Sequence, residues 1–352
     1  MTRELRFFQA LREAADVCLE RDPSVYIMGL GVPDPKGIFG STLGLREKYG
    51  DARVLDMPTS ENGMTGIAIG SAVAGMRPIL THQRIDFALL AMEQMVNQAA
   101  KWHYMFGGTM KVPLVIRMIV GRGWGQGPQH SQSLQAWFAH VPGLKVVMPA
   151  TPYDAKGLLI ASVEDDNPVI FIEHRWLYGM TGPVPEGHYT VPLGKARVAR
   201  DGGDLTIVSS SYMTLEALRA AERLSEEGVS AEVVDLRTLK PLDEAPVLES
   251  VRKTGRLIVA DTGWKMLGMG SEIVARVAEG CFGRLKAPPV RIALPDLPTP
   301  TSPSLAEKYY PRAIHIWREA RRLMGLAPAE GNPFEPAGQP LDVPDPTFTG
   351  PF

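Results

Sequence analysis

Short apolar runs alternate with helix-like segments along most of this sequence, and that alternation limits the folds open to it. Four of the runs are almost continuously apolar: "VYIMGLGV" (25–32), "RPILTHQ" (77–83), "VPLVIRMIV" (112–120) and "NPVIFIEH" (167–174). Strands without a polar face are buried on both sides, which is typical of parallel sheets covered by helices. The pattern therefore predicts an α/β fold with a mainly parallel sheet.

The alternation breaks once and then starts again. Residues 179–204 are rich in turn residues and show no helical period, so we expect a linker there. Further on, apolar runs alternate with helical patterns up to about residue 325. The tail from residue 327 holds seven prolines and cannot form a regular element. We predict two α/β domains, a linker and an extended tail, with the bounds 1–178, 205–326, 179–204 and 327–352.

Charge and cysteine content narrow the possible partners and location. The formal net charge is −2, which gives no reason to expect nucleic acid or an anionic membrane as a partner. No apolar run is long enough to span a bilayer. Cys18 and Cys281 are the only cysteines, and their separation argues against a disulfide framework. The first 22 residues form an amphipathic, partly acidic helical pattern unlike a signal peptide, so we expect a cytoplasmic protein.

One carboxylate opens a segment that is otherwise suited to burial. Glu61 stands in "MPTSENGMTGIAIGSAVAGMRP" (57–78), and fifteen uncharged positions follow it. It could simply favour the helix dipole from the first turn, with Ser60 or Thr59 as the N-cap. However, four glycines lower the helix propensity of this segment, which indicates a need for close approach. A carboxylate there would be shielded from water and suited to sharing a proton with a weakly basic ligand nitrogen.

Other polar residues are weaker candidates on their own. His130 lies in a glycine-rich loop, where a histidine is usually just a polar residue at the surface. His82 and Arg84 follow an apolar strand, at the end where open α/β sheets bind ligands, although an ion-pair role for Arg84 is equally compatible. Phe87 reads as core packing at a helix start. The glycine-rich loops lack the spacing and acidic residue of a dinucleotide site, and the histidines lack zinc-ligand spacing.

Together these segments resemble a known family. "DMPTSENGMTGIAIGSAVAGMRPI", "DFALLAMEQMVNQAAKWHYMFGG", "QHSQSLQAWFAHVPGLKVVMPATP" and "DLRTLKPLDEAPVLESVRKTGRLIVADTG" are similar to the β subunit of the thiamine-diphosphate-dependent 2-oxoacid dehydrogenases. The similarity runs from about residue 3 to residue 325. It implies a pyrimidine-binding, transketolase-like α/β domain followed by a transketolase C-terminal α/β domain. It also implies decarboxylation of a 2-oxo acid and acyl transfer to a lipoyl group.

The resemblance assigns roles to individual positions. Glu61 matches the glutamate that bonds nitrogen N1′ of the cofactor's aminopyrimidine ring, and Phe87 matches an aromatic residue against that ring. His130 matches an active-site histidine that stabilises an oxyanion or moves a proton. Some members bind a monovalent cation such as K⁺ through carbonyl oxygens and an aspartate. The matching positions here are Leu114, Ser162, Val163, Asp165 and Asn167.

A missing segment predicts a partner. The sequence has no Gly-Asp-Gly…Asn-Asn motif, which holds Mg²⁺ and the diphosphate in this superfamily. We therefore expect a separate α subunit to hold the Mg²⁺ and the diphosphate, in an α2β2 heterotetramer. A lipoyl acyltransferase would be a further partner in a larger complex.

Four positions depart from the family and leave the substrate open. Thr81, His82, Arg84 and Ile85 replace residues that the family usually has on the substrate side. These changes would also fit a split, transketolase-like enzyme that joins an acyl or two-carbon unit to another carbonyl compound. A non-catalytic paralogue is the third hypothesis, although Glu61 and His130 are both present.

Overall fold

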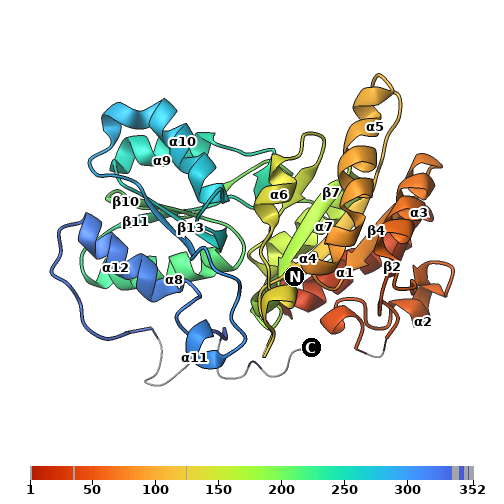
Figure 1. Ribbon diagram of the computed structural model, residues 1–352, viewed down its shortest axis with the longest axis horizontal. Helices are drawn as coiled ribbons and strands as arrows, with labels where there is room; N and C mark the ends of the chain where they lie inside the picture. The colour runs from red at the N-terminus through yellow and green to blue at the C-terminus, as the bar shows by residue number, and fades with distance from the viewer. Residues whose placement is uncertain (1, 35, 124, 335–340, 345–347, 349–352) are drawn as a thin grey trace.

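The chain folds into two α/β domains that lie side by side, with the N-terminal half at the right of Figure 1. The computed structural model describes residues 2–34, 36–123, 125–334, 341–344 and 348. None of the helices in these ranges is both long and apolar enough to cross a membrane. Cys18 and Cys281 are buried and free, as the sequence predicts.

A seven-stranded sheet forms the centre of the first domain. Its strands are parallel except the last, in the order β3 (Val54–Leu55), β2 (Val25–Gly29), β4 (Arg77–His82), β5 (Val115–Val120), β7 (Val169–His174), β6 (Lys145–Val147) and β12 (Thr238–Lys240). Every residue of β2, β5 and β7 is buried, which agrees with the almost continuous apolar runs.

Helices cover both faces of this sheet. The helices α1 (Phe7–Arg21) and α7 (Pro152–Glu164) pack on one face, with Ile27 and Val115 among their neighbours in the core. The opposite face is covered by α3 (Glu61–Val73) and by a helical stretch from residue 85 to residue 105. Successive strand residues alternate between the two cores, as the period of a strand requires.

The second covering helix is irregular. Its sequence predicts one long helix, and the structure divides it into α4 (Ile85–Ala88), a 3-10 turn η2 (Leu89–Ala91), a π-helical segment η3 (Gln94–Ala99) and α5 (Ala100–Met105). Extra residues in a π-helical turn often occur near functional sites. Here they lie between the end of β4 and the tip of α5.

The N-terminal residues and the expected linker contribute strands instead. Residues Thr2–Arg6 form β1 rather than the first turn of a helix, and β1 pairs antiparallel with β8 (Thr181–Pro185). Within the same expected linker, β9 (Arg197–Arg200) pairs antiparallel with a strand of the second domain. The stretch 179–204 therefore includes one strand of a separate two-stranded sheet, β1–β8, and the edge strand β9 of the second domain's sheet.

The second domain is built on a five-stranded sheet. Its order is β14 (Val290–Leu294), β13 (Leu257–Trp264), β10 (Leu205–Ser209), β11 (Ala231–Asp235) and β9, all parallel except β9. One face carries α8 (Tyr212–Glu226) and α12 (Ala313–Leu323), and the other carries α9 (Ala245–Thr254) and α10 (Met269–Cys281). The strand β12 follows β11 but joins the sheet of the first domain, so the two domains share a strand.

Short helical segments complete the described chain. They are η1 (Ile38–Gly40), α2 (Leu45–Tyr49), η4 (Pro128–His130), α6 (Gln135–His140), η5 (Arg175–Leu177), η6 (Phe282–Arg284) and α11 (Pro303–Ala306).

Candidate active site

Most of the polar candidates gather at one edge of the first sheet. Glu61 opens the helix that follows β3, Arg84 follows β4, and the loop 121–130 follows β5. The carboxyl ends of parallel strands lie at the same edge, so the fold brings these three segments to one side of the molecule. Open α/β sheets bind ligands outside this edge.

Glu61 is a buried carboxylate at the start of α3. Its side chain is only 7% exposed, which confirms the burial expected from the sequence. Ser60 is the N-cap, but its side chain makes no capping hydrogen bond. Among the described residues no hydrogen bond or ion pair is found for Glu61, and its carboxylate oxygens are not among the fully buried polar atoms that lack a partner. The N-terminal end of the α3 dipole favours the negative charge of Glu61, but it is not a hydrogen-bond partner.

Phe87 and His130 lie together although they come from different elements. Phe87 is on α4 and is half-buried, whereas His130 ends the short helix η4 and is exposed. Their ring centroids are 5.2 Å apart and their planes are nearly perpendicular, at 89°. Edge-to-face packing of this kind is favourable between aromatic rings. The structure thus places the candidate ring contact beside the candidate proton donor.

Arg84 holds the loop that carries His130. Its Nη1 donates to the carbonyl oxygen of Gly121 at 2.6 Å, and its Nη2 donates to Oε1 of Gln126 at 2.5 Å. Only 3% of Arg84 is exposed, and burial together with nearby Arg175 lowers its pKa to about 10. Both Nη atoms of Arg84 therefore bind loop residues, and Arg84 helps to hold the loop in place.

A second bond to the same loop was missed from the sequence. Nε2 of Gln132 donates to Oδ1 of Asp86 at 2.8 Å. Asp86 directly precedes Phe87 in the chain. Burial raises the pKa of Asp86, and in the part of the chain that the structure describes its Oδ2 has no hydrogen-bond partner. Only the position of Asp86 beside Phe87 could have drawn attention to it. The loop is therefore fixed to α4 on both sides of His130.

His82 is the most deeply buried histidine candidate. It ends β4 with 2% exposure, and burial lowers its pKa to about 4, so the ring is neutral at pH 7. Among the described residues, neither its Nε2 nor Oγ1 of the preceding Thr81 has a hydrogen-bond partner. The two side chains lie on opposite faces of the sheet, and His82 is on the face that α3 covers.

The candidate cation ligands lie at the opposite edge of the sheet. Leu114 precedes β5, and the other four positions are at the end of α7 or before β7. The carbonyl oxygens of Val163 and Asp165 both accept hydrogen bonds from Nη1 of Arg77, at 2.9 and 3.1 Å. The carboxylate of Asp165 also pairs with Lys145. Arg77 and Lys145 thus already contact the oxygen atoms of Val163 and Asp165, two of the five candidate cation ligands.

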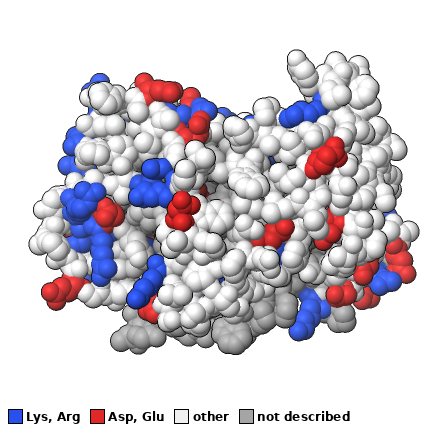
Figure 2. Space-filling model, viewed as in Figure 1, with Lys and Arg blue, Asp and Glu red and all other residues white. Residues whose placement is uncertain are grey.

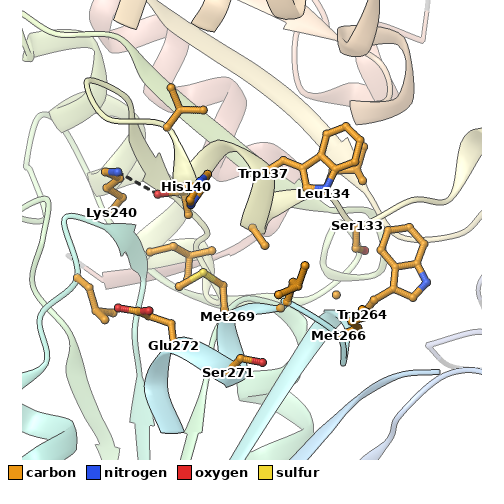
Figure 3. Close-up of a pocket in the computed structure, with 18 of the residues that line it drawn as sticks. Ser133, Leu134, Trp137, His140, Lys240, Trp264, Met266, Met269, Ser271 and Glu272 are labelled. Carbon is orange, nitrogen blue, oxygen red and sulfur yellow. Dashed lines mark hydrogen bonds between the residues drawn. The ribbon is translucent and has the colours of Figure 1, made fainter. Parts of the chain in front are cut away.

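An apolar groove lies between the two domains. Its volume is about 1180 Å³, and its walls come from α6, from the segment 239–242 and from the turn after β13. Figure 3 shows Trp137 and Leu134 on one side and Trp264, Met266 and Met269 on the other. Lys240 donates to the carbonyl oxygen of Ala139 at the rim. Neither Glu61 nor His130 lines this groove.

The fold and the site define a two-domain transketolase-like α/β protein. Residues 3–181 match the model for the transketolase pyrimidine binding domain, and residues 194–316 match the transketolase C-terminal domain. A solved structure described as a split gene transketolase, an inactive beta4 tetramer, matches with a TM-score of 0.73. It covers 92% of this chain and 99% of its own at 24% identity, which speaks for the fold alone.

Curated relatives identify the family within that class. The β subunit of acetoin:2,6-dichlorophenolindophenol oxidoreductase from Cupriavidus necator is 48% identical, over 92% of this chain and 98% of its own. The same subunit from Bacillus subtilis is 41% identical, over 92% and 98%. The mitochondrial pyruvate dehydrogenase E1 component subunit beta-2 from Oryza sativa is 43% identical, over 91% and 86%. The chain belongs to this family of E1-type β subunits.

Proposed function

We propose that this chain is the β subunit of a thiamine-diphosphate-dependent 2-oxo acid dehydrogenase and supplies the carboxylate that activates the cofactor. Glu61 carries the proposal, because it is buried and has no partner among the described residues. A buried charge is costly unless a partner is present. The aminopyrimidine ring has a weakly basic nitrogen that fits this need, and membership of the E1-type family supports the same assignment.

The residues at the sheet edge would divide the chemistry among them. Bound thiamine diphosphate supplies a carbon nucleophile and an electron sink for decarboxylation. Glu61 holds and moves a proton at N1′ of the ring, and its burial keeps water from competing for that proton. Phe87 contributes an apolar contact to the ring. His130 donates a proton to, or stabilises, an oxygen of the substrate.

A second subunit would hold the rest of the cofactor. The proposed α subunit binds the diphosphate and Mg²⁺, since this sequence lacks the motif for them. The centre and upper right of the face in Figure 2 carry few charges, and Figure 1 places α6 and α5 there. Tyr104, Met105 and Phe106 at the end of α5 are 88%, 65% and 50% exposed. Exposed apolar residues of this kind often mark subunit interfaces, which supports the α2β2 assembly.

Three finer assignments remain proposals. A monovalent cation such as K⁺ would use the oxygen atoms at the amino edge of the sheet, where carbonyl groups keep a second lone pair beside their bonds to Arg77. A lipoyl acyltransferase would accept the acyl group. The cytoplasmic location is a prediction from the sequence, and the rice relative is described as mitochondrial.

The test replaces Glu61 by glutamine in the complex with the α subunit. Glu61→Gln keeps the shape of the side chain but cannot exchange the proton, so kcat should fall about 100-fold or more. Assembly and thermal stability should stay unchanged. Glu20→Gln, at an exposed glutamate of α1, is the matched control and should keep full activity. Normal turnover of Glu61→Gln with several 2-oxo acids would refute the assigned role.

The carboligating reaction is the second candidate function. It is favoured by the buried Nε2 of His82, which has no hydrogen-bond partner among the described residues and lies on the same face of β4 as Leu80, the face that α3 covers, so it would suit a more polar substrate than the family usually takes. The complex should be assayed with 2-oxo acids and a dye as electron acceptor, and then with aldehydes as acyl acceptors. Turnover with the dye supports the dehydrogenase, whereas turnover only with aldehydes establishes the carboligating enzyme.

A further inference from the structure

The C-terminal tail reaches the loop that carries His130. Asp342 lies in the proline-rich tail, and its Oδ2 accepts a hydrogen bond from Nη1 of Arg122 at 2.5 Å. Arg122 is the second residue of the loop 121–130, 220 positions earlier in the chain. Both side chains are buried, with 1% of the arginine and 7% of the aspartate exposed. A tail segment outside both matched domains thus completes a buried ion pair at the proposed active site.

Arg122 is a junction between three segments. Besides Asp342, its guanidinium donates from Nε to the carbonyl oxygen of Gln126 at 3.0 Å and from Nη2 to that of Thr301 at 2.7 Å. Gln126 is the loop residue that also accepts from Arg84. The side chain of Arg122 therefore ties the middle of the loop both to the second domain and to the tail.

The loop needs such external contacts to hold one conformation. It contains four glycines in ten residues, and Gly121 and Gly125 have φ values of +88° and +72°, in the left-handed region. Glycine-rich backbone loses much conformational freedom when it is ordered. The backbone hydrogen bonds that join described residues of the loop include those from Gln126 to Gly123 at 3.3 Å and from His130 to Gly127 at 3.2 Å. Both are long, so side-chain bonds to the loop add to the order that its backbone gives.

The tail is seated on this chain by several bonds. Arg312 at the start of α12 donates from Nη1 to the carbonyl oxygens of Leu341 and Val343, at 2.9 and 2.6 Å. Its Nη2 donates to the carbonyl oxygen of Pro344 at 3.2 Å. These bonds fix the backbone on both sides of Asp342, so the carboxylate is presented to Arg122 in a defined place.

We propose that Asp342 is a positioning residue for the active-site loop: it neutralises and orients Arg122, and Arg122 holds the loop so that His130 stays against Phe87. The role attributed to His130 rests on the proposed function, whereas the ordering of the loop does not. Loss of the carboxylate leaves a buried cation without its counter-ion, which the protein relieves by releasing Arg122 and the loop to solvent.

Trypsin measures the release of the loop directly. It cleaves after arginine, and Arg122 is protected in the native chain by its burial. In full-length Asp342→Ala, we expect cleavage between residues 122 and 123 to become about tenfold faster, as detected by mass spectrometry. Asp342→Glu should restore part of the protection. Glu330→Gln is the control, because this glutamate is exposed in the same tail.

A double-mutant cycle tests the link to His130. In the complex with the α subunit, Asp342→Ala should lower kcat about fivefold or more and leave the affinity for thiamine diphosphate unchanged. In a His130→Ala background, the same change should have no further effect on kcat. An additive loss in that background would overturn the link to His130.

The outcomes separate this inference from the proposed function. Equal trypsin cleavage in the wild type and in Asp342→Ala, with equal thermal stability, would overturn the positioning role whatever reaction the complex catalyses. A wild-type complex without activity on any 2-oxo acid or aldehyde would overturn the proposed function. Protection of Arg122 by Asp342 would still be measurable in that case.

Discussion

A buried aspartate at the boundary between the domains should make stability depend on pH. Asp235 ends β11, is fully buried, and faces Asp154 of α7 across Arg197, whose Nη2 is 3.6 Å from an oxygen of each carboxylate. Burial, together with the negative charge of Asp154, raises the pKa of Asp235 from 3.8 to about 7. Among the described residues, Oδ2 of Asp235 has no hydrogen-bond partner.

The size and sign of the effect follow from that pKa. The folded chain holds the proton of Asp235 more tightly than the unfolded chain does. The free energy of unfolding therefore decreases as pH rises from about 4 to about 7. A rise in pKa of about three units corresponds to about 4 kcal/mol. Asp235→Asn removes the titration, so its stability relative to the wild type should increase by about that amount between pH 4 and pH 8.

Urea unfolding of the full-length chain, followed by circular dichroism across this pH range, measures the difference. Asp201→Asn is the control, because Asp201 is exposed in the segment before β10. A difference between Asp235→Asn and the wild type that stays constant with pH would refute the reasoning. A variant that is progressively less stable as pH rises would show that the ionised carboxylate is favoured by its arginine neighbours.

Three further changes have defined outcomes. Arg117→Met leaves the carboxylate of Glu173 buried without its bidentate partner, and should lower the free energy of unfolding by about 3–5 kcal/mol in urea titrations, with recovery when Glu173→Met is added. Gly143→Ala, at φ +99°, brings a Cβ within 1.8 Å of a backbone oxygen and should cost more than about 2 kcal/mol in thermal unfolding, whereas Gly50→Ala meets no atom within 4 Å and should cost less. His130→Ala should slow acyl transfer about 100-fold without weakening cofactor binding, measured by calorimetry, and an equal loss of affinity would make it a binding residue.

The elements with strong internal patterns could be predicted from the sequence. Apolar strands such as β5, which lies within the run 112–120, were expected close to their observed bounds. The strand β1 could not be predicted, because its five residues are mostly polar and its partner β8 is about 180 positions away. The strand β12 follows β11 closely along the chain, and only long-range pairing shows that it belongs to the other sheet.

The candidate site was predictable in a different way. Burial of Glu61 follows from the uncharged, glycine-rich segment after it. The contact between Phe87 and His130 depends on how a loop folds back over a helix, which no periodicity describes, and the resemblance gave each residue a role without placing the two rings together. The pair of Arg122 and Asp342 joins a loop to a tail of low complexity, so neither residue stood out in the sequence.

The crossing of β12 also limits how this chain could be divided. A truncated chain that ends after β8 would keep α1, α7 and six strands of the first sheet, but β6 would lose one of its two neighbours and become an edge strand. Unpaired N–H and C=O groups along a bare sheet edge recruit other strands, and such edges lead to aggregation. A gene split in evolution or in the laboratory would therefore leave β6 as a bare edge unless β12 were supplied as well.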